Sequence, residues 1–242
     1  MNTETIVPFG DGYRSLLLLF TLCTILLLEK SHQTLAAEIV GAEKLTALQV
    51  RAPSMLGRST LKVGQWIETE VQCKVRPKGN TPTAMERLFS QGIDRTTKGR
   101  REIVALTEKE AVLKSGKARQ ALARDHFWSS NNWERASALV QGLTGGSVRF
   151  IQIVDAEYQG IQTIHVGAKE LSCGTCFVSW AARATAPNSE KEHEFQIREF
   201  SWFHESIPIE GLAKSVSEIS TDFRGERIHI SVTETYVSSG GN

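Results

Sequence analysis

Alternation of apolar and polar residues is the feature of this chain that most constrains its fold. Segment 63–75 places most of its apolar side chains on one face and its charged side chains on the other. Segment 227–237 repeats the pattern, with Ile228, Ile230, Val232 and Tyr236 on one side. A period of two with one polar face is typical of a half-buried antiparallel strand. The chain is therefore expected to bury one face of a sheet.

Further strand-like runs are separated by turn-forming residues at 159–160, 187–189, 208–211 and 224–225. Strands that follow each other through short turns form an antiparallel meander. The expected fold class is mainly β (α+β): a large curved antiparallel sheet or half-barrel with a small helical insertion. The expected further strands are 101–106, 111–114, 148–156, 161–166, 176–185, 195–203, 212–219 and 227–237.

The domain organisation follows from where this pattern starts and stops. Residues 38–60 have no clear period and are predicted to be a lead-in segment before a β-rich domain at 61–237. The helical insertion is placed at about 117–143, because its start is rich in alanine and its end repeats apolar residues at helical spacing. The Ser/Gly tail 238–242 is predicted to be disordered from its composition.

An unbroken apolar run at residues 16–28 precedes the domain. The run is too short to cross a bilayer core of about 30 Å, which takes roughly 20 residues. It is typical of a secretory signal, here residues 1–37, with cleavage after Ala36 or Ala37. An uncleaved membrane anchor and a buried helix are the alternatives. The chain is thus expected to be exported, to the periplasm or outside the cell, and membrane-associated only if this segment stays uncleaved.

The charge balance gives no argument for nucleic-acid binding. The formal net charge is +1 at pH 7 for 242 residues, with both signs mixed along the chain. A nucleic-acid partner would call for a strongly basic face. We therefore expect no nucleic acid among the partners.

Three cysteines follow the predicted signal: Cys73, Cys173 and Cys176. An odd number in an oxidising compartment allows at most one internal disulfide. Cys173 and Cys176 could pair across a Gly-Thr turn between two strands, or Cys73 could pair with either of them. A redox site or a zinc site at this pair is a weaker alternative, since no second pair has zinc-ligand spacing.

Histidine and nucleophile patterns point to no catalytic set. A three-histidine site from His193, His204 and His229 is conceivable, but isolated histidines are the simpler interpretation. The chain has no Gly-x-Ser-x-Gly elbow and no phosphate-binding loop. We therefore expect no cofactor, no metal and no catalytic residue.

Aromatic side chains are the candidates for a ligand groove. Phe127, Trp128 and Trp133 cluster around the predicted helical insertion, and Trp66 and Trp202 lie in predicted strands. Such residues could line an apolar groove or a partner interface, although they more often belong to a core.

Three short motifs of this sequence carry a resemblance to a known family. The first is the Gly-x-Trp-x-Glu strand at 64–68, and the second is the strand 166–173 that ends in a cysteine. The third is Trp202 followed by the Pro-x-x-Gly-Leu-x-Lys turn at 208–214. Together the three motifs resemble a family of exported, largely uncharacterised bacterial β-rich proteins. In outline this family is similar to the periplasmic lipoprotein-carrier half-barrels. The resemblance implies a concave sheet that holds acyl chains under helices, and it implies no catalytic residues.

The expected function is that of a non-enzymatic exported protein. It would bind an apolar or lipidic ligand, or a lipidated partner, in the groove of a curved sheet. Burying an acyl chain yields about 0.8 kcal/mol per CH₂ group and needs no precise polar constellation. The alternatives are an envelope structural or protein-interaction module, and a redox or metal site at Cys173 and Cys176.

Overall fold

The computed structural model describes residues 38–51, 61–123, 136–137, 139–185, 191–209, 211–223 and 225–241. The predicted signal segment 1–37 lies outside these residues. In the described part of the chain, no helix is long and apolar enough to cross a membrane.

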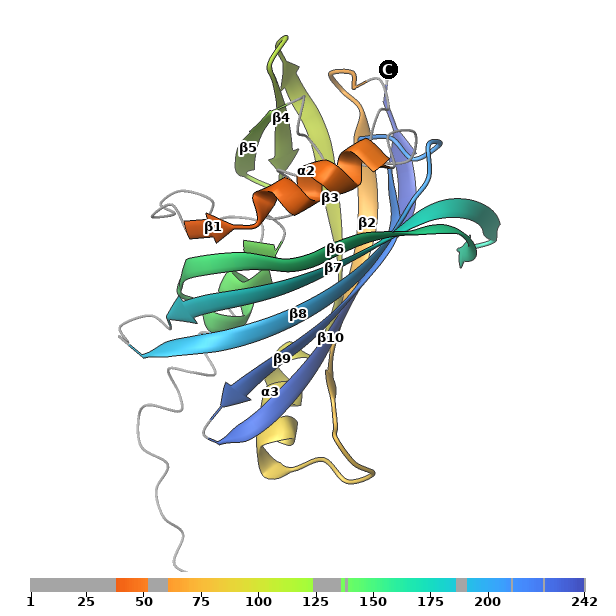
Figure 1. The fold of residues 1–242 in the computed structure, drawn as a ribbon. Helices are drawn as coiled ribbons and strands as arrows, with labels where there is room; N and C mark the ends of the chain where they lie inside the picture. The colour runs from red at the N-terminus through yellow and green to blue at the C-terminus, as the bar shows by residue number, and fades with distance from the viewer. Residues whose placement is uncertain are drawn as a thin grey trace, which may run out of the picture.

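One ten-stranded sheet organises the chain, in the order β1-β6-β7-β8-β9-β10-β2-β3-β4-β5 (Figure 1). All neighbours pair antiparallel except β1 and β6, which are parallel. This confirms the predicted mainly β fold class. The strands are β1 Glu38–Val40, β2 Trp66–Arg76, β3 Arg95–Leu106, β4 Glu110–Ser115, β5 Ala118–Ala123, β6 Ser147–Val166, β7 Lys169–Thr185, β8 Glu192–Phe203, β9 Leu212–Phe223 and β10 Glu226–Gly240.

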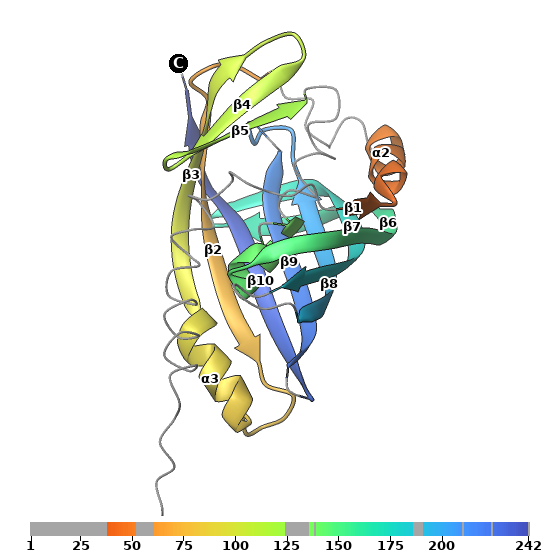
Figure 2. The ribbon, with the colours of Figure 1, turned by 90° about the vertical axis from the view of Figure 1, so that its left-hand side faces the viewer.

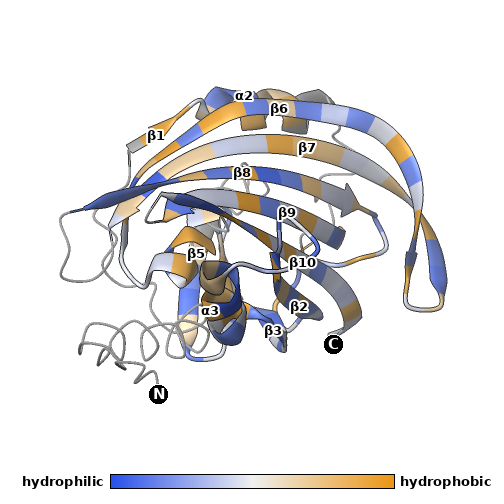
Figure 3. Ribbon diagram, turned by 90° about the horizontal axis from the view of Figure 1, so that it is seen from below, coloured by the Kyte–Doolittle hydropathy of each residue, from blue (hydrophilic) through white to orange (hydrophobic). Residues whose placement is uncertain are grey.

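The sheet curves, and helices pack against one of its faces. Seen from below, β6 to β10 form an arch over α3 (Ala84–Ile93) (Figure 3). The helix α2 (Ala42–Arg51) lies beside β1 and β6, at the opposite end of the sheet from α3 (Figure 2). Residues 136–137 and 139–144 are also helical, as predicted for the end of the insertion. We call the face of the sheet that packs on the helices the inner face and the opposite one the outer face.

The main hydrophobic core lies between the inner face and the helices. Leu45 and Leu48 of α2 and Phe89 and Ile93 of α3 are all buried in it. Phe89 meets Phe223 of β9 edge to face, with ring centroids 5.3 Å apart. In β6, β7, β8 and β10, every second side chain along part of the strand joins this core, because successive side chains of a strand point to opposite faces. The strand β9 contributes Leu212 and Ile219.

Two predicted assignments at the ends of the domain are wrong. The lead-in segment 38–60 contains β1 and α2, and β1 pairs with β6 through residues such as Ile39 and Ile151. The tail predicted to be disordered from residue 238 extends β10 instead, with Ser239 opposite Ile67 and Gly240 opposite Trp66. In both places pairing with a neighbouring strand overrides a weak local signal.

The prediction of a helix for the alanine-rich start of the insertion is also wrong. Residues 118–123 form the strand β5, which pairs with β4 through a two-residue turn at Gly116 and Lys117. Gly116 has a φ of 58°, a conformation that glycine adopts without steric cost. The hairpin turn and the strand pairing outweigh the helix propensity of alanine, which is only a weak prior.

Two segments that were predicted to be turns lie within continuous strands. Residues 159–160 form a bulge inside the 20-residue strand β6, where the pairing with β7 shifts between Tyr158 and Ile161. The Gly-Thr pair at 174–175 lies within β7, which runs unbroken from Lys169 to Thr185. The actual hairpin turn between β6 and β7 is at Gly167 and Ala168, where Gly167 has a φ of 61°.

Candidate functional site

The inner face is apolar along one band that crosses the sheet. The band consists of five residues, each the cross-strand partner of the next: Trp180 of β7, Ile197 of β8, Ile219 of β9, Ile230 of β10 and Val75 of β2. All five are buried in the main core. The band therefore forms a continuous apolar floor under the helices.

Next to this floor, four polar side chains face inward on two adjacent strands. Glu199 of β8 is the cross-strand partner of Ser217 of β9, and Ser201 of β8 is the partner of Ser215 of β9. Each of the four is only 2–5 % exposed. Ser201 Oγ donates a 2.8 Å hydrogen bond to Glu199 Oε1. We call these four residues the interior polar patch.

An ion pair borders the interior polar patch on the β10 side. Glu234 of β10 is the cross-strand partner of Ser215. Its carboxylate lies 2.6 Å from Nη2 of Arg101 of β3, and the two side chains are 13 % and 17 % exposed. The guanidinium is therefore already engaged with a carboxylate, so its charge is largely compensated.

A buried indole donor borders the interior polar patch on the apolar side. Trp180 is 1 % exposed, and its Nε1 has no hydrogen-bond acceptor among the described residues. Its cross-strand partner Ile197 lies two residues before Glu199 on β8, so the indole and the patch are diagonal neighbours. Leaving such a donor unsatisfied costs about 1–3 kcal/mol. An occupant of this region that supplied an acceptor would recover that free energy.

The inner face thus combines an apolar surface with a few hydrogen-bonding groups. Beside the apolar floor lie a carboxyl group, three hydroxyls and one indole N–H, which could form hydrogen bonds with the polar end of a mostly apolar molecule. The serine side chains are small, in contrast to the isoleucine and tryptophan side chains of the neighbouring band.

The two tryptophans predicted for a groove lie on the outer face. Trp66 precedes the inward-facing Ile67, and the Arg100 guanidinium stacks 4.2 Å above its ring. Trp202 follows the inward-facing Ser201 and donates from Nε1 to Gln162 Oε1 at 3.1 Å. Neither belongs to the interior polar patch. The other predicted groove residues, Phe127, Trp128 and Trp133, lie outside the described residues.

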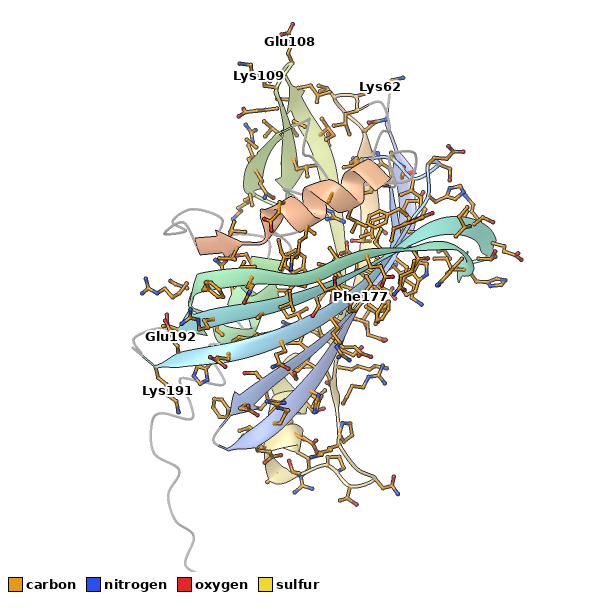
Figure 4. The ribbon with its side chains drawn as sticks, viewed as in Figure 1. Lys62, Glu108, Lys109, Phe177, Lys191 and Glu192 are labelled. Carbon is orange, nitrogen blue, oxygen red and sulfur yellow. The ribbon has the colours of Figure 1, made fainter. Side chains whose placement is uncertain are left out.

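An aromatic row on the outer face was not predicted. Phe177 of β7 is labelled in Figure 4 and lies 5.0 Å from Phe200 of β8, between ring centroids. Phe200 stacks in turn on Trp202 at 6.5 Å. All three are half-buried, and the rings cover one another. The row therefore consists of packing contacts that stabilise β7 against β8.

The predicted disulfide is wrong for the three described cysteines, because all of them are free thiols. Cys176 belongs to the main core on the inner face, whereas Cys173 belongs to a separate cluster with Val166 and Ile207. Three residues apart on one strand, the two side chains point to opposite faces. Cys73 lies on β2, and three strands separate β2 from β7.

Burial makes these thiols poor nucleophiles. It raises the pKa of Cys173 to about 11 and that of Cys176 to about 12. It also raises the pKa of Cys73, although the nearby Arg95 guanidinium opposes this shift. A redox cysteine needs a lowered pKa, because the thiolate is the reactive form. The environments found here are typical of structural cysteines.

The histidines of the conceivable three-histidine site are dispersed. His193 of β8 stacks on Phe223 at 5.8 Å, and burial lowers its pKa. His204 lies beyond β8 with its ring nitrogen 2.7 Å from Ser206 Oγ, and His229 is a partner of Arg76 on the outer face. Within the described residues, no group of three or more His, Cys, Asp or Glu side chains could hold a metal ion.

The interior polar patch was not predicted from the sequence, although its strands were. In segment 195–203 the inward positions are occupied by Phe195, Ile197, Glu199, Ser201 and Phe203. The sequence did contain one signal for it: Glu199 stands at a position where the alternation of the strand calls for an apolar residue.

No protein-family model matches this chain, and neither a curated protein nor a solved structure matches it.

Proposed function

We propose that this chain is an exported, non-enzymatic binding protein that holds an amphiphilic ligand inside its curved sheet. The apolar part of the ligand would lie along the floor from Trp180 to Val75, and its polar end would meet the interior polar patch. The apolar run at 16–28 supports export, as expected from the sequence.

One observation carries the proposal: the inner face changes from apolar to polar between adjacent rows of the same strands. On β8 the change falls between Ile197 and Glu199, and on β9 between Ile219 and Ser217. Natural cores avoid buried polar groups unless a partner satisfies them. A boundary of this kind is what a molecule with an apolar chain and a polar end requires.

Burial of the interior polar patch sets a condition on entry. With side chains only 2–5 % exposed, a ligand reaches the patch only when part of the surrounding polypeptide moves aside. Binding then exchanges protein contacts for ligand contacts. The affinity is therefore expected to depend on how well the ligand replaces those contacts.

A matched pair of serine variants on β9 tests the proposal. Ser217 faces the interior, whereas Ser220 faces outward opposite His229. We expect Ser217→Leu to weaken binding of phenylnaphthylamine, a fluorescent apolar probe, by about tenfold, which is roughly 1.4 kcal/mol. Ser220→Leu should leave the affinity unchanged. Thermal denaturation of both variants checks that they are folded.

Analysis of the untreated protein completes this test. Native mass spectrometry of the purified full chain should detect a co-purifying amphiphile. If the wild-type protein carries none and the probe does not bind, or if both variants bind the probe equally, the proposal is wrong.

A further inference from the structure

We infer that the β8–β9 loop, which joins Phe203 to Leu212, is the segment that moves aside to admit the ligand to the interior polar patch. The inference rests on the proposed function and concerns access to the same site. It depends on where the loop lies, on what its two buried isoleucines contact, and on the backbone conformation of one of them.

The β8–β9 loop lies next to the interior polar patch. Ser201 and Ser215 of the patch are cross-strand partners on β8 and β9. The next inward-facing partners toward the end of both strands are Phe203 and Leu212, and the loop connects these two residues. One cross-strand pair therefore separates the loop from the patch.

The two isoleucines of the loop are buried in two different clusters. Ile207 is 1 % exposed and belongs to the cluster that contains Cys173 of β7. Ile209 is fully buried and belongs to the cluster that contains Ile67 of β2. Tyr236 of β10 packs against both clusters. The loop is therefore anchored by apolar contacts to strands on both sides of the β8–β9 pair.

The backbone of Ile209 is strained. Its φ is 68°, and in the described part of the chain no other residue except glycine has a positive φ. This conformation is an outlier for a β-branched residue and persists only where the surrounding contacts enforce it. When the loop is released, Ile209 can return to an ordinary φ, and this gain offsets part of the lost apolar contacts. The loop is therefore easier to open than its burial alone suggests.

Helix α3, the rival for the moving part, is attached to the sheet by a hydrogen bond of its own. Asp94 Oδ1, at the end of α3, accepts from the Val75 N–H at 2.6 Å, and this bond would break if the helix moved away. In the loop, the His204 N–H donates to Gly211 O at 2.8 Å. This bond closes the loop on itself and can remain intact while the loop swings outward. The geometry therefore favours the loop as the part that moves.

Cys173 can report on the loop in the absence of any ligand. It is fully buried in the cluster of Ile207, so N-ethylmaleimide reaches it only when this cluster opens. Tandem mass spectrometry of the labelled, folded full chain gives the labelling rate of each thiol. Each thiol is compared with itself, so its intrinsic reactivity cancels.

We expect Ile209→Ala, a change in the other cluster, to accelerate the labelling of Cys173 by about tenfold, because the loop opens as a unit. Cys176, which lies in the main core, should keep its rate.

A second variant of Ile209 separates strain from packing. Ile209→Ala and Ile209→Gly both lose the apolar side chain, but glycine adopts a positive φ without steric cost and alanine does not. Ile209→Gly should therefore accelerate the labelling of Cys173 by only about threefold. Equal acceleration by the two variants would show that strain does not contribute to opening and would overturn the inference. If Ile209→Ala does not fold, an unchanged rate in Ile209→Gly overturns it.

The association rate of phenylnaphthylamine tests whether the loop is the entrance. Stopped-flow fluorescence should show association about fivefold faster with Ile209→Ala than with the wild-type protein, because the open fraction limits entry. Ile93→Ala is the matched control, since it removes the same side chain from α3, where Ile93 is also buried in the core. It should leave the association rate unchanged. Faster association with Ile93→Ala alone would place the entrance under α3 and overturn the inference.

Failure of the inference can be told apart from failure of the proposed function. If the wild-type protein binds the probe but Ile209→Ala leaves Cys173 labelling or probe association unchanged, the inference is wrong and the proposed function stands. The same holds if the labelling of Cys176 accelerates as much as that of Cys173, because the whole core then opens. If the wild-type protein neither binds the probe nor carries a co-purifying amphiphile, the proposed function is wrong and the inference with it.

Discussion

Gly41 combines two local effects that substitution can separate: the strain of a positive φ and the clash of an added Cβ with β6. It joins β1 to α2 with a φ of 83°, and a Cβ added there would lie 2.6 Å from the backbone oxygen of Ile153. Gly64 has a similar φ of 86°, but a Cβ added to it would meet no atom within 4 Å. Both glycines adopt a conformation that costs other residues about 1–2 kcal/mol. Only Gly41 also allows a close approach to β6.

We expect Gly41→Ala to lower the free energy of unfolding by about 3 kcal/mol, from backbone strain plus the clash with β6. Gly64→Ala should cost only the strain, about 1 kcal/mol. Urea denaturation followed by circular dichroism measures both. Equal losses in the two variants would show that the approach of Gly41 to Ile153 does not contribute.

At the scale of single elements, Glu86 fixes the start of α3. Its carboxylate accepts hydrogen bonds from the backbone N–H groups of Lys78 and Thr83, both at 2.8 Å, and Thr83 Oγ1 accepts from the Glu86 N–H at 3.1 Å. This capping box satisfies backbone donors at the start of the helix and holds the preceding loop. The two backbone hydrogen bonds hold the pKa of Glu86 below its usual value of 4.5.

The lowered pKa of Glu86 predicts a pH-dependent contribution to stability. Because the folded state favours the ionised form, the contribution is complete above about pH 4.5 and is lost as the pH falls through the lowered pKa. Glu86→Gln should therefore have a lower urea midpoint than the wild-type protein at neutral pH, and the difference should shrink under acid conditions.

Glu108→Gln, on the exposed β3–β4 turn labelled in Figure 4, is the matched control and should show no such change. A difference between Glu86→Gln and the wild-type protein that is the same at neutral and acid pH would contradict the assignment.

The elements that could be predicted from the sequence are those whose signal is complete within the segment. The strands predicted at 195–203 and 227–237 correspond to β8 and β10, and the pair at 101–106 and 111–114 corresponds to β3 and β4. The helix α3 was missed although its start carries a local signal, since Thr83 and Glu86 have the spacing of a capping box. The burial of Phe89 and Ile93, by contrast, depends on strands that are distant in sequence.

At the scale of the whole molecule, the pairing of β10 with β2 joins the two parts of the sheet. Val75 of the first long strand lies opposite Ile230 of the last. The Arg101–Glu234 ion pair crosses this junction, because Arg101 lies on β3 and Glu234 on β10, with β2 between them. The pair therefore connects the β2–β5 part of the sheet to the β6–β10 part.

We expect Glu234→Gln and Arg101→Met each to lower the free energy of unfolding by about 3 kcal/mol, because each removes one member of a mostly buried ion pair. The double variant should lose clearly less than the sum of the two, as a coupled pair does. Urea denaturation gives all the values. The exposed pair Arg100 and Glu102, 3.6 Å apart, is the comparison and should couple by less than about 1 kcal/mol.

Additive losses in the Arg101 and Glu234 variants would mean that the two parts of the sheet are held together by the strand pairing alone.

Neither the order of the strands nor the interior polar patch could be predicted, because both depend on which strands lie side by side. Alternation assigns a side chain to one face of a strand, but it does not say which strand lies next to it. Ser215 and Ser217 are ordinary strand residues until the pairing with β8 places them beside Ser201 and Glu199. The patch is a property of cross-strand pairing between segments, and no single segment contains it.

The position of β10 inside the sheet has a consequence for synthesis. Of the ten described strands β10 is synthesised last, and it is flanked by β9 and β2. The backbone groups of β2 on that side therefore stay unpaired until β10 has been made. A product that ends before residue 226 would leave one edge of β9 and one edge of β2 unpaired. Unpaired strand edges associate between molecules. Premature termination should thus yield aggregates in place of a smaller soluble fragment.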